Sequence, residues 1–225
     1  MSRDAFLARV RQAAAAGRAY RVHLEPESAY AAKSAPVPDD VCAQMAAAVE
    51  EVGGLAARAA DLGEAAEIIT GLLDKYSPKS ALCWRHELLN SLRLTEILER
   101  RGIAVQTHEQ LAALDEPRRR AAIMAADIGL TSADAAIADT GSLVMCSGPG
   151  HERVASLTPP VHIAIVERAQ IAPNLTEAFA RLFGQSHDLP SNATIITGPS
   201  KTGDIELTLT TGVHGPGQWH VVIIG

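Results

Sequence analysis

The sequence is poor in the residues on which several common protein classes depend. Cysteine occurs only three times in 225 residues, at Cys42, Cys83 and Cys146. No two of them form a Cys-x-x-Cys pair, so we predict neither a disulfide framework nor a zinc or thioredoxin-like site built on such a pair. A four-cysteine iron–sulfur cluster also needs more thiols than this chain has. We therefore expect three reduced, buried thiols, as in a cytoplasmic protein.

Aromatic residues, excess positive charge and long apolar runs are also scarce. Aromatics make up 4% of the chain, which argues against a base-stacking surface for nucleic acid. The net charge of −6 argues against a general binder of nucleic-acid phosphates. No apolar run approaches the roughly 20 residues of a membrane-spanning helix. We therefore predict a soluble protein, with neither a nucleic-acid partner nor a membrane span, long enough for one domain with an appendage.

Residues 1–38 differ in pattern from the rest of the chain. The first stretch has Phe6, Leu7 and Val10 on one helical stripe, among alanines and several arginines. An organellar transit peptide has this basic character, and so has an amphipathic helix lying on an acidic body, which we favour. Prolines and a glycine over residues 17–38 then indicate a connecting arm. We predict an N-terminal helix and arm over 1–38, followed by a domain over 39–225.

From residue 39 onward, helical and strand patterns alternate. Asp61 and Glu64 predict the start of the clearest helix, whose apolar residues recur on one face up to Tyr76. Residues 161–166 are nearly all apolar, as in a strand covered on both faces. Residues 193–224 show several strand patterns and few helices, which indicates some antiparallel pairing. The sequence therefore predicts an α/β fold with a mixed, mainly parallel sheet and helices on both faces.

Two strand patterns, 135–138 and 143–147, flank the tetrapeptide Asp139-Thr140-Gly141-Ser142. Aspartic proteases share this tetrapeptide, but their chemistry needs two such loops with paired carboxylates, and this chain has one copy. The residues are typical of a glycine-assisted turn whose side chains bond to nearby backbone. They also suit a loop that binds an anion, because hydroxyls and backbone N–H groups converge there.

A second loop, Gly198-Pro199-Ser200-Lys201-Thr202-Gly203-Asp204, follows a strand pattern that we expect to be buried. It lacks the Gly-Lys-Ser/Thr of a Walker A loop, and no Ser-x-x-Lys accompanies it as in penicillin-recognising enzymes. We expect it at the carboxyl end of a strand, where open α/β sheets bind ligands. Its backbone N–H groups, hydroxyls and lysine suit a phosphate or carboxylate, although an ordinary exposed loop accounts for the same residues.

A third loop, Gly212-Val213-His214-Gly215-Pro216-Gly217, precedes the last strand pattern. Asp204, Glu206 and His214 are candidates for acid–base chemistry if the fold brings them together. No His-Glu-x-x-His motif is present, so hydrogen-bonded loop residues are favoured over a metal site, and we predict neither metal nor cofactor. His162, within an apolar strand, is interpreted as a core histidine with its hydrogen bonds satisfied.

Together, segments 138–143, 198–206 and 212–216 carry a family resemblance. They read Ala-Asp-Thr-Gly-Ser-Leu, Gly-Pro-Ser followed by Asp-Ile-Glu, and Gly-Val-His-Gly-Pro. From about residue 40 to its end the chain resembles the lactate utilization protein C family, the LutC/YkgG group of the LUD domain. Family members commonly have alanine where this chain has Gly203.

The resemblance implies a fold similar to the NagB/RpiA/CoA-transferase superfamily, which includes the 5-formyltetrahydrofolate cyclo-ligases. It also implies a role in oxidising L-lactate to pyruvate, alongside two companions that resemble iron–sulfur oxidoreductases. The low cysteine content fits this role, because the companions would then carry the clusters.

Two functions are compatible with these residues. The first is a non-iron–sulfur accessory component of an L-lactate oxidation system with iron–sulfur subunits as partners. The second is a stand-alone enzyme or binding protein for a phosphorylated, CoA-linked or carboxylate metabolite. Glu206 or Asp139 would then be the nucleophile or base, with His214 a further candidate. The predicted set of residues that bind an anionic metabolite is Thr140, Gly141, Ser142, Gly198, Pro199, Ser200, Lys201, Thr202 and Asp204. The sequence leaves open whether the chain catalyses a reaction.

Overall fold

The computed structural model describes residues 2–17, 40–184, 189–203 and 209–225. The chain divides into two units, residues 1–34 and 35–225. In the first unit, α1 (Arg3–Gly17) confirms the N-terminal helix, and its apolar side chains Phe6 and Val10 are exposed. In the described part of the chain, no helix is long and apolar enough to cross a membrane.

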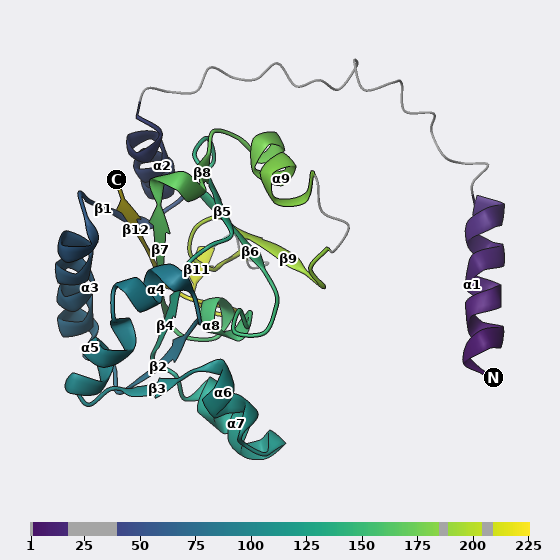
Figure 1. Cartoon of the computed structure of the whole chain (residues 1–225), viewed down its shortest axis with the longest axis horizontal. Helices are drawn as coiled ribbons and strands as arrows, with labels where there is room; N and C mark the ends of the chain where they lie inside the picture. Colours follow the sequence, from purple (N-terminus) through teal and green to yellow (C-terminus); the bar gives the residue numbers. More distant parts are fainter. Residues whose placement is uncertain (1, 18–39, 185–188, 204–208) are drawn as a thin grey trace. The chain divides into compact units, whose positions relative to one another are not determined.

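Within the described ranges, six parallel strands form the main sheet of the second unit (Figure 1). Their spatial order is β1 (Leu55–Ala59), β12 (Gln218–Ile224), β7 (Val161–Glu167), β4 (Ile128–Thr131), β2 (Ser80–Cys83) and β3 (Ala104–Gln106). β7 and β12 each have neighbours on both sides and six of seven residues buried, which explains their near-continuous apolar sequences. The predicted α/β class with a mainly parallel sheet is confirmed.

The antiparallel pairs lie in two smaller sheets. β5 (Ala135–Ile137) and β6 (Ser142–Cys146) form the hairpin predicted around residues 139–142. β6 also pairs with β9 (Ala193–Ile196), and β8 (Ile171–Ala172) lies beside β5. A separate ribbon pairs β10 (Lys201–Gly203) with β11 (Leu209–Thr211). The antiparallel pairing expected over residues 193–224 is confirmed, although part of the strand predicted at 205–211 lies outside the described residues.

Helices cover both faces of the six-stranded sheet. α3 (Leu62–Tyr76) begins where the Asp61 carboxylate accepts a hydrogen bond from Glu64 N, and packs on β1 and β12. α2 (Val41–Glu51) also packs on these strands, whereas α8 (Val154–Leu157) packs on β4, β2 and β7. The further helices are α4 (Glu87–Ser91), α5 (Leu94–Arg100), α6 (His108–Ala112), α7 (Glu116–Met124), α9 (Leu175–Phe183) and the short 3-10 turn η3 (Arg168–Gln170).

Glycines at two positions let neighbouring segments approach the sheet closely. A Cβ atom on Gly129 of β4 would lie 1.7 Å from Ala155 O, so only glycine lets α8 pack this closely. A Cβ atom on Gly54 would lie 2.5 Å from the ring of Trp219. Gly129, His162 and Trp219 are register partners on β4, β7 and β12 and therefore share one face of the sheet. Gly129 therefore lets α8 lie close to the sheet on the face that carries His162, and Gly54 lets the chain pass close to the Trp219 ring.

Candidate functional site

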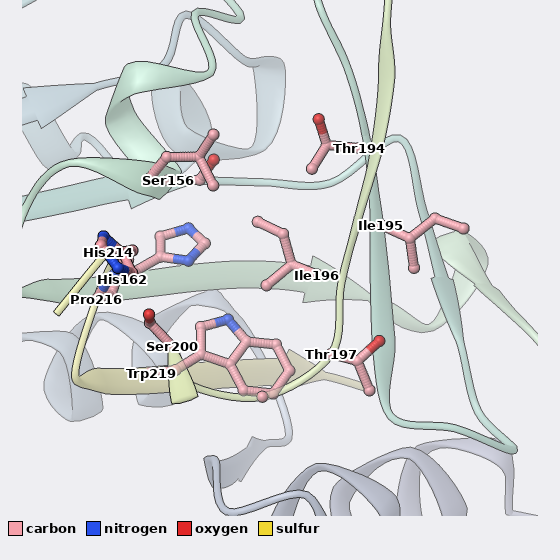
Figure 2. A pocket seen from close by; sticks show the side chains of 13 residues that line it. Ser156, His162, Thr194, Ile195, Ile196, Thr197, Ser200, His214, Pro216 and Trp219 are labelled. Atoms are coloured by element: carbon pink, nitrogen blue, oxygen red, sulfur yellow. The ribbon is translucent and has the colours of Figure 1, made fainter. Parts of the chain in front are cut away.

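A pocket of about 250 Å³ lies between the sheet, α8 and the loops that follow β9 and β11 (Figure 2). The sheet contributes His162 and Trp219, and α8 contributes Ser156. Ile196, at the end of β9, lies across the pocket from His162 (Figure 2). Of the lining residues that the structure describes, none is Asp, Glu, Lys or Arg. A ligand therefore meets apolar surface, hydroxyl groups, and imidazole and indole nitrogens there.

The second and third loops found in the sequence come together at this pocket. Ser200 N donates a hydrogen bond to Pro216 O at 2.8 Å, and Gly212 N donates to Ser200 O at 2.9 Å. Gly198, Ser200 and His214 line the pocket, with His214 exposed. The two loops therefore form one wall of the pocket, as their predicted role requires.

The first loop reaches this wall through hydroxyl groups. Ser142 Oγ lies 2.8 Å from Thr140 Oγ1 and 2.7 Å from Thr197 Oγ1, and Thr197 lines the pocket. Gly141 has φ +62°, and a Cβ atom on it would lie 2.5 Å from Ala48 C in α2. The predicted turn is thus held against α2, and its residues support the pocket wall rather than line it.

Lys201 does not face the pocket. Its Nζ atom donates a hydrogen bond to Val52 O at 2.7 Å, at the end of α2. Pro199 and Thr202 are likewise absent from the pocket lining that the structure describes. Of the predicted second-loop residues in the described ranges, Gly198 and Ser200 are therefore the ones that meet the pocket.

The structure describes two of the four predicted acid–base groups, Asp139 and His214. Asp139 is exposed, and its backbone N–H donates to Pro173 O at 3.1 Å. Asp204 and Glu206 lie outside the described residues. His214 is therefore the predicted acid–base residue that the structure places at the pocket.

His162 is a core histidine, as predicted, but only one of its two ring nitrogens has a hydrogen-bond partner among the described residues. Its ring is fully buried and its Nε2 atom lies 2.8 Å from Thr131 Oγ1. Its Nδ1 atom has no hydrogen-bond partner among the described residues. Burial, together with the neighbouring His220, lowers the pKa of His162 to about 3, so the ring is neutral near pH 7. The interpretation is wrong for Nδ1, and an unsatisfied buried group of this kind costs about 1–3 kcal/mol.

Trp219 presents a second buried polar atom. Its side chain is 2% exposed, and Nε1 lacks a hydrogen-bond partner within the described ranges. Figure 2 shows this nitrogen turned toward the space between His162 and Ile196. An indole N–H can only donate, so it calls for an acceptor in the pocket. We refer to His162 Nδ1 and Trp219 Nε1 as the two unpaired nitrogens.

No motif in the sequence predicts the two unpaired nitrogens. The sequence shows only that His162 and Trp219 are each the second residue of an apolar strand. Only the parallel pairing of β7 with β12 makes these places neighbours. The sequence separates them by more than fifty residues, which hides the pair from any motif search.

The second loop follows the carboxyl end of a strand, β9, as expected, but the pocket that it lines lies at the amino ends of β7 and β12 in the parallel sheet. β9, which precedes the second loop, is only half-buried and belongs to the four-stranded sheet. Its end is therefore not part of the carboxyl edge of the parallel sheet. The expectation that a buried strand precedes this loop is wrong for the same reason.

The carboxyl ends of β2 and β4 carry a cluster that sequence analysis missed. The rings of Trp84 and His151 stack with centroids 4.4 Å apart, and His86 lies 5.8 Å from His151. His151 Nδ1 lies 4.0 Å from Asp134 Oδ1. Burial, followed by the nearby His151, lowers the pKa of His86. These residues come from three separate segments, so no local spacing predicts the cluster.

Comparison with known proteins places this fold and its loops in a family. A family model described as the LUD domain matches residues 42–224. A lactate utilization protein C from Halalkalibacterium halodurans is 33% identical over 153 residues, which cover 67% of this chain and 64% of that protein. A lactate utilization protein C 1 from Bacillus mycoides is 33% identical over 162 residues, 70% of this chain and 68% of that protein. The matched stretch thus spans about two thirds of these relatives' lengths.

A solved structure shares the fold at low sequence identity. The crystal structure of a DUF162 family protein from Deinococcus radiodurans aligns with a TM-score of 0.55 and 19% identity, covering 82% of this chain and 96% of that chain. The family model extends over nearly all of the second unit, and the Bacillus mycoides relative matches over two thirds of its length. The chain therefore belongs to the LUD domain family, in its lactate utilization protein C group.

Proposed function

We propose that this chain is a non-iron–sulfur component of a system that oxidises L-lactate to pyruvate. The observation that carries the proposal is its kinship to proteins named lactate utilization protein C, at 33% identity over two thirds of the chain. The match includes the segments that form the pocket, because the LUD domain model runs from residue 42 to 224.

In this proposal, iron–sulfur partner subunits carry the electrons. Oxidation of lactate to pyruvate releases two electrons, and a [4Fe–4S] cluster is held by four thiolates, whereas the chain has three cysteines. Burial raises the pKa of the Cys83 thiol to about 12, and burial with the nearby Asp134 raises that of Cys146 to about 11. Both therefore stay protonated and are poor metal ligands. We also propose a cytoplasmic location, which the three free cysteines support.

Reconstitution with the iron–sulfur partners tests this function. The partner subunits are expressed with and without the chain, and L-lactate-dependent reduction of an artificial electron acceptor is measured. We expect the chain to co-purify with them and lactate-dependent reduction to require it. Partners that reduce the acceptor equally fast without the chain, and do not bind it, would contradict the proposal.

The pocket favours a second function, a binding protein or enzyme for a small metabolite. The two unpaired nitrogens support it, because buried polar groups in native proteins are nearly always satisfied by protein, water or ligand. His214, which lines the pocket, is then the candidate acid–base group, and Asp139 and Glu206 stay predicted bases.

Thermal melting with a metabolite panel tests the second function. The panel contains lactate, pyruvate, CoA thioesters, sugar phosphates and folates. A ligand at one hundred times its Kd adds about 2.7 kcal/mol. For a chain of this length that raises the Tm by about 5–11 °C. A melting temperature unchanged by every compound would contradict a metabolite-binding function.

A further inference from the structure

We propose that the pocket binds a compact monocarboxylate with a hydroxyl or carbonyl oxygen on the carbon next to the carboxylate. The juxtaposition that carries this inference is that of the two unpaired nitrogens, on register partners His162 and Trp219. The inference deepens the second proposed function, and it rests on the lactate role only for the choice of acids to test.

The charge of the lining limits the charge of the ligand. A phosphomonoester or a CoA diphosphate would bring two or more negative charges into the pocket. The described lining residues offer no Lys or Arg to pair with them, and Lys201 donates to Val52 O instead. Buried charge without a partner is strongly unfavourable. A carboxylate spreads one charge over two oxygens that neutral donors can satisfy.

Trp219 Nε1 supplies one such donor. It is fixed as a donor by its chemistry, and the ring is held in place by close contact with Gly54. Ser200 lines the same pocket, and its hydroxyl can donate as well. His214, also at the pocket, is a third donor. These three donors suit the two oxygens of one carboxylate.

His162 Nδ1 recognises the neighbouring oxygen in either oxidation state. Its Nε2 atom pairs with Thr131 Oγ1, and a hydroxyl both donates and accepts. When Nε2–H donates to Thr131, Nδ1 is an acceptor for the hydroxyl of a 2-hydroxy acid. When the Thr131 hydroxyl donates to Nε2, Nδ1–H is a donor to the carbonyl of a 2-oxo acid. Because burial keeps the ring neutral, both tautomers are available to one site.

Tryptophan fluorescence provides a direct readout. The chain has two tryptophans, so Trp84→Phe leaves Trp219 as the single tryptophan. We expect L-lactate and pyruvate each to change its emission saturably. Propionate, which lacks the second oxygen, should bind about tenfold more weakly, and phosphoenolpyruvate should not compete. Calorimetry on the unmodified full chain repeats each titration, so the result does not depend on the Trp84 variant.

Paired variants separate recognition from folding. Trp219→Phe and His162→Gln each remove one unpaired nitrogen and should weaken L-lactate binding about tenfold or more in calorimetry. His220→Gln is the matched control, because this buried histidine pairs with the Tyr76 hydroxyl on the other face of the sheet. It should leave the affinity unchanged, and circular dichroism verifies the fold of each variant.

Three outcomes overturn the inference. They are no calorimetric binding of either acid at millimolar concentration, affinity unchanged in both Trp219→Phe and His162→Gln, and tighter binding of phosphoenolpyruvate than of L-lactate. If binding fails while lactate-dependent reduction still requires the chain, the ligand class is wrong and the component role stands. If binding holds while reconstitution fails, the component role is wrong and the ligand class stands.

Discussion

At the residue scale, two buried histidines, His162 of β7 and His220 of β12, lie on opposite faces of the six-stranded sheet. His220 Nε2 lies 2.8 Å from the Tyr76 hydroxyl of α3. His162 lines the pocket, and it pairs one ring nitrogen with Thr131 while the other is buried without a partner among the described residues. Burial lowers the pKa of both, to about 4 for His220 and about 3 for His162. Both rings are therefore neutral in the folded chain near pH 7.

Because the buried His162 ring stays neutral in the folded chain but can be protonated in the unfolded chain, the free energy of unfolding depends on pH. The folded pKa of His162 lies below the ordinary value of 6.5, so the unfolded chain binds one more proton as pH falls. Its contribution to stability is complete above pH 6.5 and is lost as pH falls toward 3. We expect a slope of up to about 1.4 kcal/mol per pH unit in that window. Urea unfolding between pH 7.5 and 5 measures it, and His162→Gln should make the curve less steep, leaving the contribution of His220. Equal slopes in both proteins would contradict the assignment.

At the element scale, α8 is positioned by the absence of a side chain beneath it. A Cβ atom on Gly129 would come within 1.7 Å of Ala155 O, so the helix would have to move away from β4. Ser156 and Leu157 of α8 line the pocket. The pocket wall therefore depends on a single glycine of the sheet.

We predict that Gly129→Ala destabilises the chain by about 3 kcal/mol, since overpacking against backbone cannot relax by side-chain movement. Gly71→Ala is the matched control, because Gly71 lies within α3 and a Cβ atom there meets nothing within 4 Å. It should stabilise the chain by about 0.5–1 kcal/mol. Chemical unfolding of both variants measures the difference. A Gly129→Ala chain as stable as the parent would contradict the packing of α8.

Local signals predicted individual elements better than their arrangement. Asp61 and Glu64 correctly marked the start of α3, because capping depends on residues three apart. The position of the second loop after a strand was predicted correctly, but the burial of that strand was not, since it depends on which sheet β9 joins. The pairing of His162 with Trp219 also depends on distant strands. Local chemistry thus indicated the loops of the site but not its buried nitrogens.

At the scale of the whole molecule, the core belongs to the second unit. Among the described residues, the buried apolar side chains run from Val41 to Ile224. The LUD domain match covers nearly the same range, residues 42–224. Residues 18–38 of the predicted arm lie outside the described residues, and none of the side chains described in α1 is buried.

We predict that a chain shortened to residues 39–225 folds with a Tm within about 2 °C of the full chain, because surface changes cost within about 0.5 kcal/mol. Scanning calorimetry of both chains measures this. A Tm lowered by about 5 °C or more would show that residues 1–38 stabilise the domain and would contradict the predicted boundary.

The central claim is that this chain serves lactate oxidation through its pocket. Consumption of L-lactate by cells lacking their own copy, complemented with the parent chain, His220→Gln or Trp219→Phe, tests it most directly. We predict that the parent and His220→Gln restore consumption, whereas Trp219→Phe, expressed at an equal level, restores little. Consumption that is normal without the chain, or fully restored by Trp219→Phe, would contradict the account.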